Sequence, residues 1–487
     1  MSNGSITHAQ GFGQPESYRG VDRVLLGQYV ALGVSVAASV WLVAFAPKHS
    51  GLTALVVVCA TAAAGAFSVL QRRASRRGGR RLGGAVVAVG IGMVMLVAVG
   101  APNRTSNDLW SYGSYGRMVV VHHANPYVAT PSEFPHDPFS RRVSQIWQHR
   151  SSVYGPVWVG VTAVDALVVG TSPLGNRLFF QLLAAIAATT ILTIVWKRTR
   201  SPAALVWLGL HPVFVFAINS GHADLLIGLA ILVGSLSIAR GQAGWVAGVL
   251  IGLAALIKVT ALLGLLGIVL WAWRARRRRL VRQTLVGAGA VVVLGYAPFF
   301  ADASHVLGNA DHTVSLWSPW NGLADLILGH DALRQLPNPL AFNQTLETLF
   351  YAGTGLVVVL AVVIGWRASA AREPRPVAGV TAAAYPIGAA YSLPWYANWA
   401  LPCLTDPDPS PLAWIVWLQA ATMLTALKLH DHPAGTIADA ISRGLITDVL
   451  PVVWVIAFIV FGLRQTQISD IVDRHLGGDE QLVADTR

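Results

Sequence analysis

Long apolar runs divide the chain into a series of predicted helices. Residues 24–47, 52–70, 82–101 and 285–300 consist almost entirely of small and aliphatic side chains. Each run approaches the roughly 20 residues that a helix needs to cross a lipid bilayer. The pattern predicts an all-α fold, a polytopic transmembrane helical bundle of about 12–13 spans.

Short clusters of arginine orient these spans, because basic residues concentrate in cytoplasmic loops. The strongest clusters are 71–81 (QRRASRRGGRR), 197–200, 274–279 (RARRRR) and 367–375, and all are expected in the cytoplasm. The span that follows Arg81 then runs outward. The resulting map has a cytoplasmic tail at 1–23, a membrane domain at 24–464 with outer loops at 102–177 and 301–344, and a C-terminal tail at 465–487.

Some segments do not fit a simple alternation of crossings. Residues 155–171 are short and contain Asp165, which is costly in mid-bilayer, so we expect a helix lying along the outer surface. Residues 245–273 are too long for one comfortable span and carry Lys258 near the middle, which predicts two short helices turning near that lysine.

The C-terminal third continues the alternation. Residues 377–393 are predicted to run outward and 412–427 to return inward. Asp406 and Asp408 stand between prolines in a T-D-P-D-P segment, which is typical of a turn and is expected outside. The direction of the last span, 445–463, is left open because the residues before it mix His, Asp and Arg.

Composition supports the membrane class. The chain has 487 residues, of which 54% are hydrophobic and 12% charged, whereas a soluble domain carries about 25% charged residues. The net charge of +12 lies in clusters beside spans, so it indicates topology and not nucleic-acid binding. Cys59 and Cys403 are too few for a disulfide framework or a cysteine metal site. We expect no cleavable signal peptide, because the first apolar run is too long for one.

A polar and aromatic stretch, NDLWSYGSYGRMVVVHHANPY at 107–127, follows an apolar run that is predicted to end outside. An aromatic belt and a snorkelling Arg117 would account for its tyrosines and tryptophan. That interpretation explains Asp108 and the Asn125-Pro126-Tyr127 segment poorly. Since loops on a rigid scaffold carry function, we expect a site here.

The residues DLWSYGSYGR, HHANPY, FPHDPF and VYGPVW follow one another in this first outer loop. Further along stand GHADLLIGL at 221–229, AALIKVTALL at 254–263 and SLPWYANWALP at 392–402. Together these motifs resemble the polyprenyl-phosphate-mannose-dependent α-(1→6)-mannosyltransferases of actinobacteria. The resemblance implies the GT-C fold, an all-helical membrane fold with juxtamembrane helices in its first outer loop.

The resemblance also implies an activity. Mannose would move from a polyprenyl-phosphate-mannose donor to a glycolipid or mannan acceptor at the outer face of the plasma membrane. The linkages would be α-(1→6), as in the assembly of lipomannan and lipoarabinomannan in the cell envelope. The resemblance also implies that the general base is the lone acid at the start of the first outer loop, which in this sequence is Asp108.

The chemistry of such a transfer needs a base for the acceptor hydroxyl and a cation or donors for the departing phosphate. With a β-linked donor, one in-line displacement inverts the anomeric carbon, and the phosphate leaves without protonation. One carboxylate then suffices, so we expect no cofactor and no obligatory metal. Asp137, Asp224, Asp311, Asp406 and Asp408 remain candidates for oxygen ligands to an assisting ion.

Arg117 is the first candidate for the donor phosphate, because its guanidinium fork matches phosphate oxygens. Lys258 is the second, because a lysine inside an apolar run needs an anionic partner unless it snorkels. The candidate substrate-binding residues are Trp110, Tyr112, Tyr115, Asn125, Tyr154, His222, Asp224, Trp395 and Tyr396. Asp224 could instead cap a helix, and Trp395, Tyr396 and Trp399 could form an aromatic belt.

Weaker candidates lie in the second outer loop, at Asp311, His312, Trp317 and Trp320. His122 and His123 are not both expected to be catalytic.

Two alternatives remain open. The same machinery could transfer another lipid-linked sugar, such as arabinose. A lipid or glycan transporter would instead show inverted repeats and ionisable residues at the membrane midplane. The polar residues concentrate at the predicted outer face, which favours an enzyme.

Overall fold

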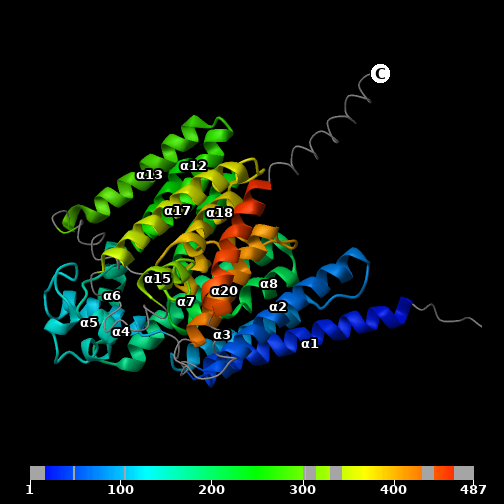
Figure 1. The fold of residues 1–487 in the computed structure, drawn as a ribbon, viewed down its shortest axis with the longest axis horizontal. Helices are drawn as coiled ribbons and strands as arrows, with labels where there is room; N and C mark the ends of the chain where they lie inside the picture. The colour runs from blue at the N-terminus through cyan, green and yellow to red at the C-terminus, as the bar shows by residue number, and fades with distance from the viewer. Residues whose placement is uncertain are drawn as a thin grey trace, which may run out of the picture.

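The computed structural model describes residues 17–47, 50–103, 106–299, 302, 314–329, 343–429 and 444–464, and every regular element in them is a helix (Figure 1). The first half contains α1 (Ser17–Ala44), α2 (Gly51–Arg76), α3 (Gly84–Gly100), α4 (Asp108–Val120), α5 (Gln145–Gln148), α6 (Pro156–Val169), α7 (Pro173–Thr199), α8 (Pro202–Gly209), α9 (Pro212–Asn219) and α10 (Asp224–Ala239). The second half contains α11 (Gly244–Ala255), α12 (Leu262–Arg274), α13 (Arg278–Tyr296), α15 (Asn321–Leu328), α17 (Gln344–Ala368), α18 (Pro374–Gly388), α19 (Leu401–Leu404), α20 (Pro411–Leu429) and a last helix, Gly444–Arg464. The predicted all-α bundle is confirmed.

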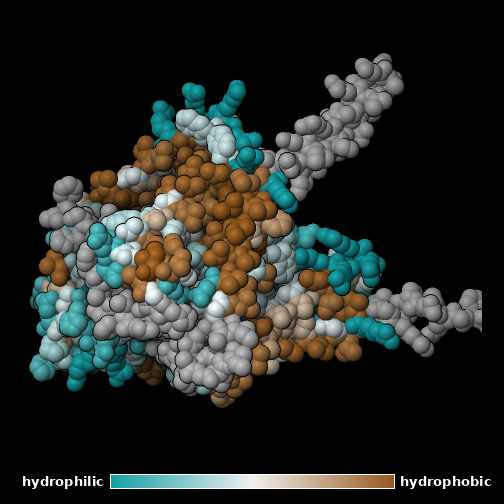
Figure 2. Space-filling view, in the orientation of Figure 1, coloured by the Kyte–Doolittle hydropathy of each residue, from teal (hydrophilic) through white to brown (hydrophobic). Residues whose placement is uncertain are grey.

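Seven helices among the described residues are long and apolar enough to cross a membrane, and α8 with α9, bent by 57°, would make an eighth span. Five further apolar helices have only 10–17 residues. These five include α3, α6, α10 and α11, and the expected number of 12–13 spans stays a prediction. Figure 2 shows hydrophobic surface over the middle of the bundle, with hydrophilic surface near α4–α6 and beyond the α12–α13 turn. The chain is a multi-pass membrane protein.

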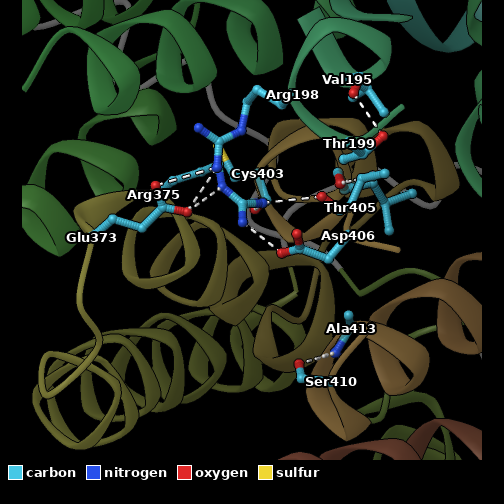
Figure 3. A network of polar contacts seen from close by, with 11 residues as sticks. Val195, Arg198, Thr199, Glu373, Arg375, Cys403, Thr405, Asp406, Ser410 and Ala413 are labelled. Carbon is cyan, nitrogen blue, oxygen red and sulfur yellow. Dashed lines mark hydrogen bonds and ion pairs between the residues drawn. The ribbon is translucent and has the colours of Figure 1, made fainter. Parts of the chain in front are cut away.

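Ion pairs gather the arginine clusters at one end of the bundle. Arg72 and Arg76 lie 3.5 and 2.5 Å from the carboxylate of Asp408. A second group joins Arg198 to Glu373 at 3.0 Å, and Arg375 to both Glu373 and Asp406 at 3.0 and 2.5 Å (Figure 3). We call this the arginine end. The side chains at Arg72, Arg198 and Arg375 were expected on one side of the membrane, and the structure places them together.

The predicted location of the T-D-P-D-P turn is wrong. It was expected outside, but Asp406 and Asp408 pair with arginines of the arginine end. Helix α20 follows this turn and ends where the carbonyl of Lys428 accepts a hydrogen bond of 3.1 Å from Ser50, at the start of α2. Because Ser50 and Arg76 lie at opposite ends of α2, α20 runs away from the arginine end. This direction is opposite to the predicted one.

The reason lies in the segment between α18 and α20. After Gly388 the chain returns to the arginine end through η5 (Pro394–Trp399) and α19, and residues 394–405 are all buried. The Arg375 guanidinium donates to the carbonyls of Cys403 and Thr405 at 2.6 and 3.1 Å. Irregular backbone is tolerated at membrane depth only when protein covers it. A crossing of this kind has no long apolar run, so the hydropathy pattern does not show it.

The predicted turn near Lys258 is present. Helix α11 begins beside α13 at the arginine end, where Gly244 N–H donates to Gln283, and α12 returns to Arg274, which donates to the carbonyl of Trp366. The break between them, residues 256–261, contacts the outer loop through a hydrogen bond from the N–H of Gly155 to the carbonyl of Ile257. A Cβ on Gly155 would lie 2.4 Å from the carbonyl oxygen of Leu256, so only glycine allows this approach.

The first outer loop is built on α4 packed against α6. A Cβ on Gly116 would lie 1.9 Å from the carbonyl oxygen of Thr162, so the two helices touch backbone to backbone at this glycine. Helix α6 has 14 residues and is too short to cross a membrane by the length criterion. Asp165 in α6 is fully buried in the protein. A surface position for α6 stays a prediction.

The structure predicts that the arginine end and the start of α7 lie on opposite sides of the membrane. In a variant without Cys59 and Cys403, single cysteines at Asp408 and Arg76 should react with a membrane-impermeant maleimide from one side of the membrane. A cysteine at Thr171, before α7, should react only from the other side. The side chains of Asp408 and Arg76 are exposed in the structure, so each should be reachable. Labelling of Asp408→Cys and Thr171→Cys from the same side would contradict this topology.

Candidate active site

A cavity of about 350 Å³ lies where the start of α4, the α11–α12 break and η5 meet. It is at the opposite end of the bundle from the arginines. Its lining combines a carboxylate, an ammonium group, hydroxyls and many aromatic rings: Ser106, Asn107, Asp108, Ser111, Tyr115, Ser144, Trp147, Val153, Tyr154, Gly155, Lys258, Val259, Thr260, Tyr296, Phe350, Tyr385, Tyr391, Leu393, Trp395, Tyr396, Trp399 and Leu427.

Asp108 is the first residue of α4, and its side chain is 24% exposed. Burial raises the pKa of the Asp108 carboxyl, but contacts with His222, Ser106 and Lys258 outweigh burial and hold the pKa below its usual value. The N-terminal end of a helix also favours a negative charge. Asp108 is therefore an ionised carboxylate at neutral pH, as a general base must be.

Lys258 supplies the positive charge of the cavity. No other lysine or arginine is among the described residues that line it. Its ammonium lies 3.1 Å from Oδ1 of Asp224, and that oxygen also accepts a hydrogen bond of 2.7 Å from Trp399. The ammonium sits over the rings of Tyr396 and Tyr154, at 4.4 and 5.5 Å from their centroids. The ion pair and the rings offset the cost of holding this charge in an apolar bundle.

One part of the cavity wall is aromatic. Tyr396 and Trp399 stack with ring centroids 4.5 Å apart, and Tyr385 packs against both. These rings are carried by η5 and α18. Such a surface can pack against a sugar ring or an isoprenoid chain while its hydroxyl and indole groups donate hydrogen bonds.

The structure brings together most of the residues singled out in the sequence. Six of them line the cavity: Asp108, Tyr115, Tyr154, Lys258, Trp395 and Tyr396. Three others lie directly behind its wall: Tyr112, His222 and Asp224. These residues come from five separate segments of the chain between Asp108 and Tyr396, so their grouping is a property of the fold.

Arg117, the first candidate for the donor phosphate, is not among the residues that line the cavity. Its Nε donates to Asp137 at 2.7 Å, and its terminal nitrogen donates to the carbonyl of Gly170 at 3.1 Å. Asp137 also lies 3.0 Å from His122. The buried guanidinium is thus committed to holding the outer loop together.

Burial raises the pKa of the Asp137 carboxyl, but hydrogen bonds from His122, Phe139 N–H and Arg117 lower it by more. The net shift of the pKa is therefore downward. Since the folded-state pKa is depressed, this group stabilises the fold above its unfolded pKa. The contribution is lost as the pH falls through the folded-state value.

Trp110 and Asn125 are also placed within the loop and not at the cavity. Trp110 stacks on Phe139, and the guanidinium of Arg142 lies over the Trp110 ring, 4.8 Å from its centroid. Asn125 accepts a hydrogen bond from Tyr127 N–H and donates to Asp302 at 2.6 Å. Both residues contact other parts of the outer loop and are not among the residues that line the cavity.

In the second outer loop, Trp317 and Trp320 donate to the carbonyls of Ser392 and Gly388 at 2.5 and 2.8 Å. They anchor this loop to the chain after α18 and do not line the cavity. Asp311 and His312 lie outside the described residues.

Several lining residues were not singled out in the sequence: Trp147, Tyr296, Phe350, Tyr385 and Tyr391. Tyr391 stands next to the SLPWYANWALP motif and could have been included with it. Tyr296 and Phe350 occur near the ends of apolar helices, where an aromatic residue is usually part of an interfacial belt. No local signal separates a cavity residue from a belt residue there.

The described residues contain no group of three or more His, Cys, Asp or Glu side chains able to hold a metal ion. Asp406 and Asp408, considered above as oxygen ligands, pair with arginines at the far end of the bundle.

The fold and the cavity define a multi-pass membrane protein with a carboxylate and an ammonium in an aromatic-walled site. The family model described as "Alpha-(1->6)-mannopyranosyltransferase, N-terminal domain" matches residues 24–275, just over half of the chain. The chain belongs to this family. The matched region contains Asp108 and Lys258 but ends before η5.

Two curated relatives are similar over part of the chain. Alpha-(1->6)-mannopyranosyltransferase B of Corynebacterium glutamicum is 32% identical over 181 residues, which cover 33% of this chain and 30% of that protein. Alpha-(1->6)-mannopyranosyltransferase A of Mycobacterium tuberculosis is 27% identical over 213 residues, covering 42% of this chain and 40% of that protein. The chain thus spans about a third of the length of the curated relatives it matches. No solved structure matches the chain.

The placement of Arg117 makes a stability prediction. Arg117→Met should lower the free energy of unfolding by about 3–5 kcal/mol, because it leaves the buried Asp137 carboxylate without its cation. Arg141→Met, at an exposed arginine of the same loop, is the matched control and should change little. Thermal unfolding of the detergent-solubilised protein measures both. Since protonation of Asp137 removes the unpaired charge, the deficit of Arg117→Met should shrink as the pH falls toward the ordinary Asp pKa of about 4. Equal stability of the two variants would contradict this role.

Proposed function

We propose that this protein is a glycosyltransferase that moves mannose from a polyprenyl phosphate donor to a glycan or glycolipid acceptor, forming α-(1→6) linkages. The observation that carries the proposal is that Asp108 and Lys258 line one aromatic-walled cavity. The family supports the choice of mannose, because both curated relatives are named α-(1→6)-mannopyranosyltransferases.

In this mechanism Asp108 takes the proton of the acceptor hydroxyl as the hydroxyl oxygen attacks the anomeric carbon. The new bond forms on the face opposite the phosphate, so the configuration inverts. The bond between the anomeric carbon and the phosphate oxygen breaks, and its electron pair stays on the phosphate. Lys258 stabilises the charge that develops there, as a fixed cation in a poorly solvated site can do.

The cavity lining suits a lipid-linked sugar. Val259 is 48% exposed at the cavity, and Tyr296, Phe350, Leu393 and Leu427 add apolar surface that an isoprenoid chain could cover. Trp395 and Tyr396 offer ring faces to the sugar itself. The donor would then lie with its phosphate near Lys258 and its sugar toward Asp108.

The position of the cavity supports an outer-face reaction. Arginine clusters concentrate in the cytoplasm, and the arginine end lies at the opposite end of the bundle from the cavity. The site would therefore open on the extracytoplasmic side of the plasma membrane, where lipid-linked sugars are displayed after translocation across the bilayer.

The direct test uses purified protein reconstituted with radiolabelled polyprenyl-phosphate-mannose and a panel of candidate mannan and glycolipid acceptors. Transfer of label to one acceptor, with release of polyprenyl phosphate, is the expected result. The same assay with lipid-linked arabinose separates the alternative donor. Absence of transfer from every lipid-linked sugar would count against a glycosyltransferase.

Asp108→Asn should insert and fold like the parent but transfer almost nothing. The amide keeps the size and much of the hydrogen bonding of the carboxylate, but it cannot accept the hydroxyl proton. We expect kcat to fall by about 10²–10⁴-fold with little change in donor KM. The rate of transfer by purified variants measures this, and a loss smaller than about 10²-fold would exclude Asp108 as the base.

Lys258→Met should raise the apparent KM for the donor. Loss of one charge-assisted phosphate contact costs on the order of 2–3 kcal/mol, a rise of about 30- to 150-fold. Because the single variant leaves Asp224 buried and unpaired, the double variant Lys258→Met with Asp224→Asn serves as the folding control. It should unfold near the parental temperature yet keep the high KM. A double variant with parental KM would remove Lys258 from the phosphate site.

A further inference from the structure

His222 occupies a closed position behind the cavity wall. It follows Gly221, whose φ of +62° is easy only for glycine and whose missing Cβ makes room for Leu109 and Phe180. The imidazole is 1% exposed and stacks on Trp395, with ring centroids 4.2 Å apart and planes 17° from parallel. It does not line the cavity.

The polar surroundings of the ring are two carboxylates. Nδ1 of His222 lies 3.4 Å from Oδ2 of Asp108 and 4.0 Å from Oδ2 of Asp224. A ring nitrogen that faces two carboxylates must carry a proton, because its lone pair would otherwise be repelled by both. Oδ1 of Asp224 is engaged by Lys258 and Trp399, and its Oδ2 has no hydrogen-bond partner among the residues that the structure describes. Because Asp108 Oδ2 is the closer of the two carboxylate oxygens, at 3.4 Å against 4.0 Å, it is the nearest acceptor to the imidazole.

We propose that His222 is a positioning residue for the base: its Nδ1–H donates to Oδ2 of Asp108 and fixes that carboxylate, which leaves Oδ1 to take the acceptor proton. This inference rests on the proposed function and deepens it. In this structure neither ring nitrogen of His222 has a hydrogen-bond partner among the described residues, and the Nδ1–Oδ2 separation of 3.4 Å is longer than a usual hydrogen bond. Catalytic hydrogen bonds are often long before substrate binds, and the proposal is that this contact shortens into a hydrogen bond in the substrate complex.

The proton balance is simple. The hydroxyl proton moves to Asp108 as the new glycosidic bond forms, and the phosphate leaves with its electron pair. His222 keeps its Nδ1 proton throughout, and Asp108 returns its proton to water when product departs. His222 thus acts on the orientation and charge of the base and on no atom of the substrate.

The charged and titratable groups around Asp108 allow a pH test. They are His222 and Asp224 behind it, Lys258 from the α11–α12 break, and the hydroxyls of Tyr112 and Tyr154. Among the groups that hold the pKa of Asp108 down, His222 is the largest. Removing the imidazole N–H should therefore raise the pKa of Asp108 and move the acid limb of kcat/KM to higher pH.

Three substitutions at His222 separate the N–H from the ring. An asparagine amide places its N–H near the position of Nδ1, a glutamine amide places it near Nε2, and phenylalanine keeps only the stack on Trp395. We expect His222→Phe and His222→Gln to lose about 10–100-fold in kcat, the usual size for a partner that orients an active group. His222→Asn should retain most of the parental rate. Donor KM should stay near parental in all three, since His222 does not contact Lys258.

A second measurement does not depend on transfer. Infrared difference titration follows the carbonyl band of a protonated carboxyl, and the Asp108 band is assigned by its loss in Asp108→Asn. The midpoint should rise in His222→Phe and stay near parental in His222→Asn. If the wild type transfers no sugar, the proposed function fails, and this titration still decides whether His222 controls Asp108.

Two results would overturn the inference. One is an unchanged rate and titration midpoint in His222→Phe. The other is an equal loss in His222→Asn and His222→Phe at equal thermal stability, which would show that the ring itself is needed and not its N–H.

Discussion

The ion pair between Lys258 and Asp224 is the constraint on which the site depends. Asp224 begins α10, Lys258 lies at the α11–α12 break, and Trp399 of η5 donates to the same carboxylate oxygen. A buried charge in an apolar bundle is tolerated only with a close partner, so these three parts of the chain must meet. Their meeting places the ammonium at the cavity, brings the aromatic face of η5 beside it, and sets His222, two residues before Asp224, against Asp108.

The outer loop is organised by a separate pair that does not reach the cavity. Arg117 and Asp137, with His122, hold residues 117–170 together. Close packing of α4 on α6 at Gly116 fixes the direction of α4, and Asp108 stands at its first turn. The two charged pairs therefore have different tasks. One gives the loop its shape, and the other presents a cation to the cavity that the loop covers.

The buried return through η5 and α19 links chemistry to topology. Its backbone is irregular, and protein on all sides satisfies it, including the Arg375 guanidinium at the arginine end. Because this segment crosses without a long apolar helix, α20 runs from the arginine end to the cavity, where Leu427 joins the lining. The same segment supplies Trp395, Tyr396 and Trp399. The aromatic wall of this cavity is thus carried by a crossing that the hydropathy pattern does not reveal.

The sequence by itself determined the membrane class, the all-helical fold and the break at Lys258, because apolar length and isolated charges are local properties. Only the tertiary structure decided which polar residues meet. Arg117 looked like a phosphate ligand, yet Asp137, 20 residues away, takes its guanidinium. His222 looked like a sugar contact, yet it is sealed behind Trp395. The partner of a charged side chain depends on which segments pack together, and that packing joins residues too distant in the chain for any local pattern to record.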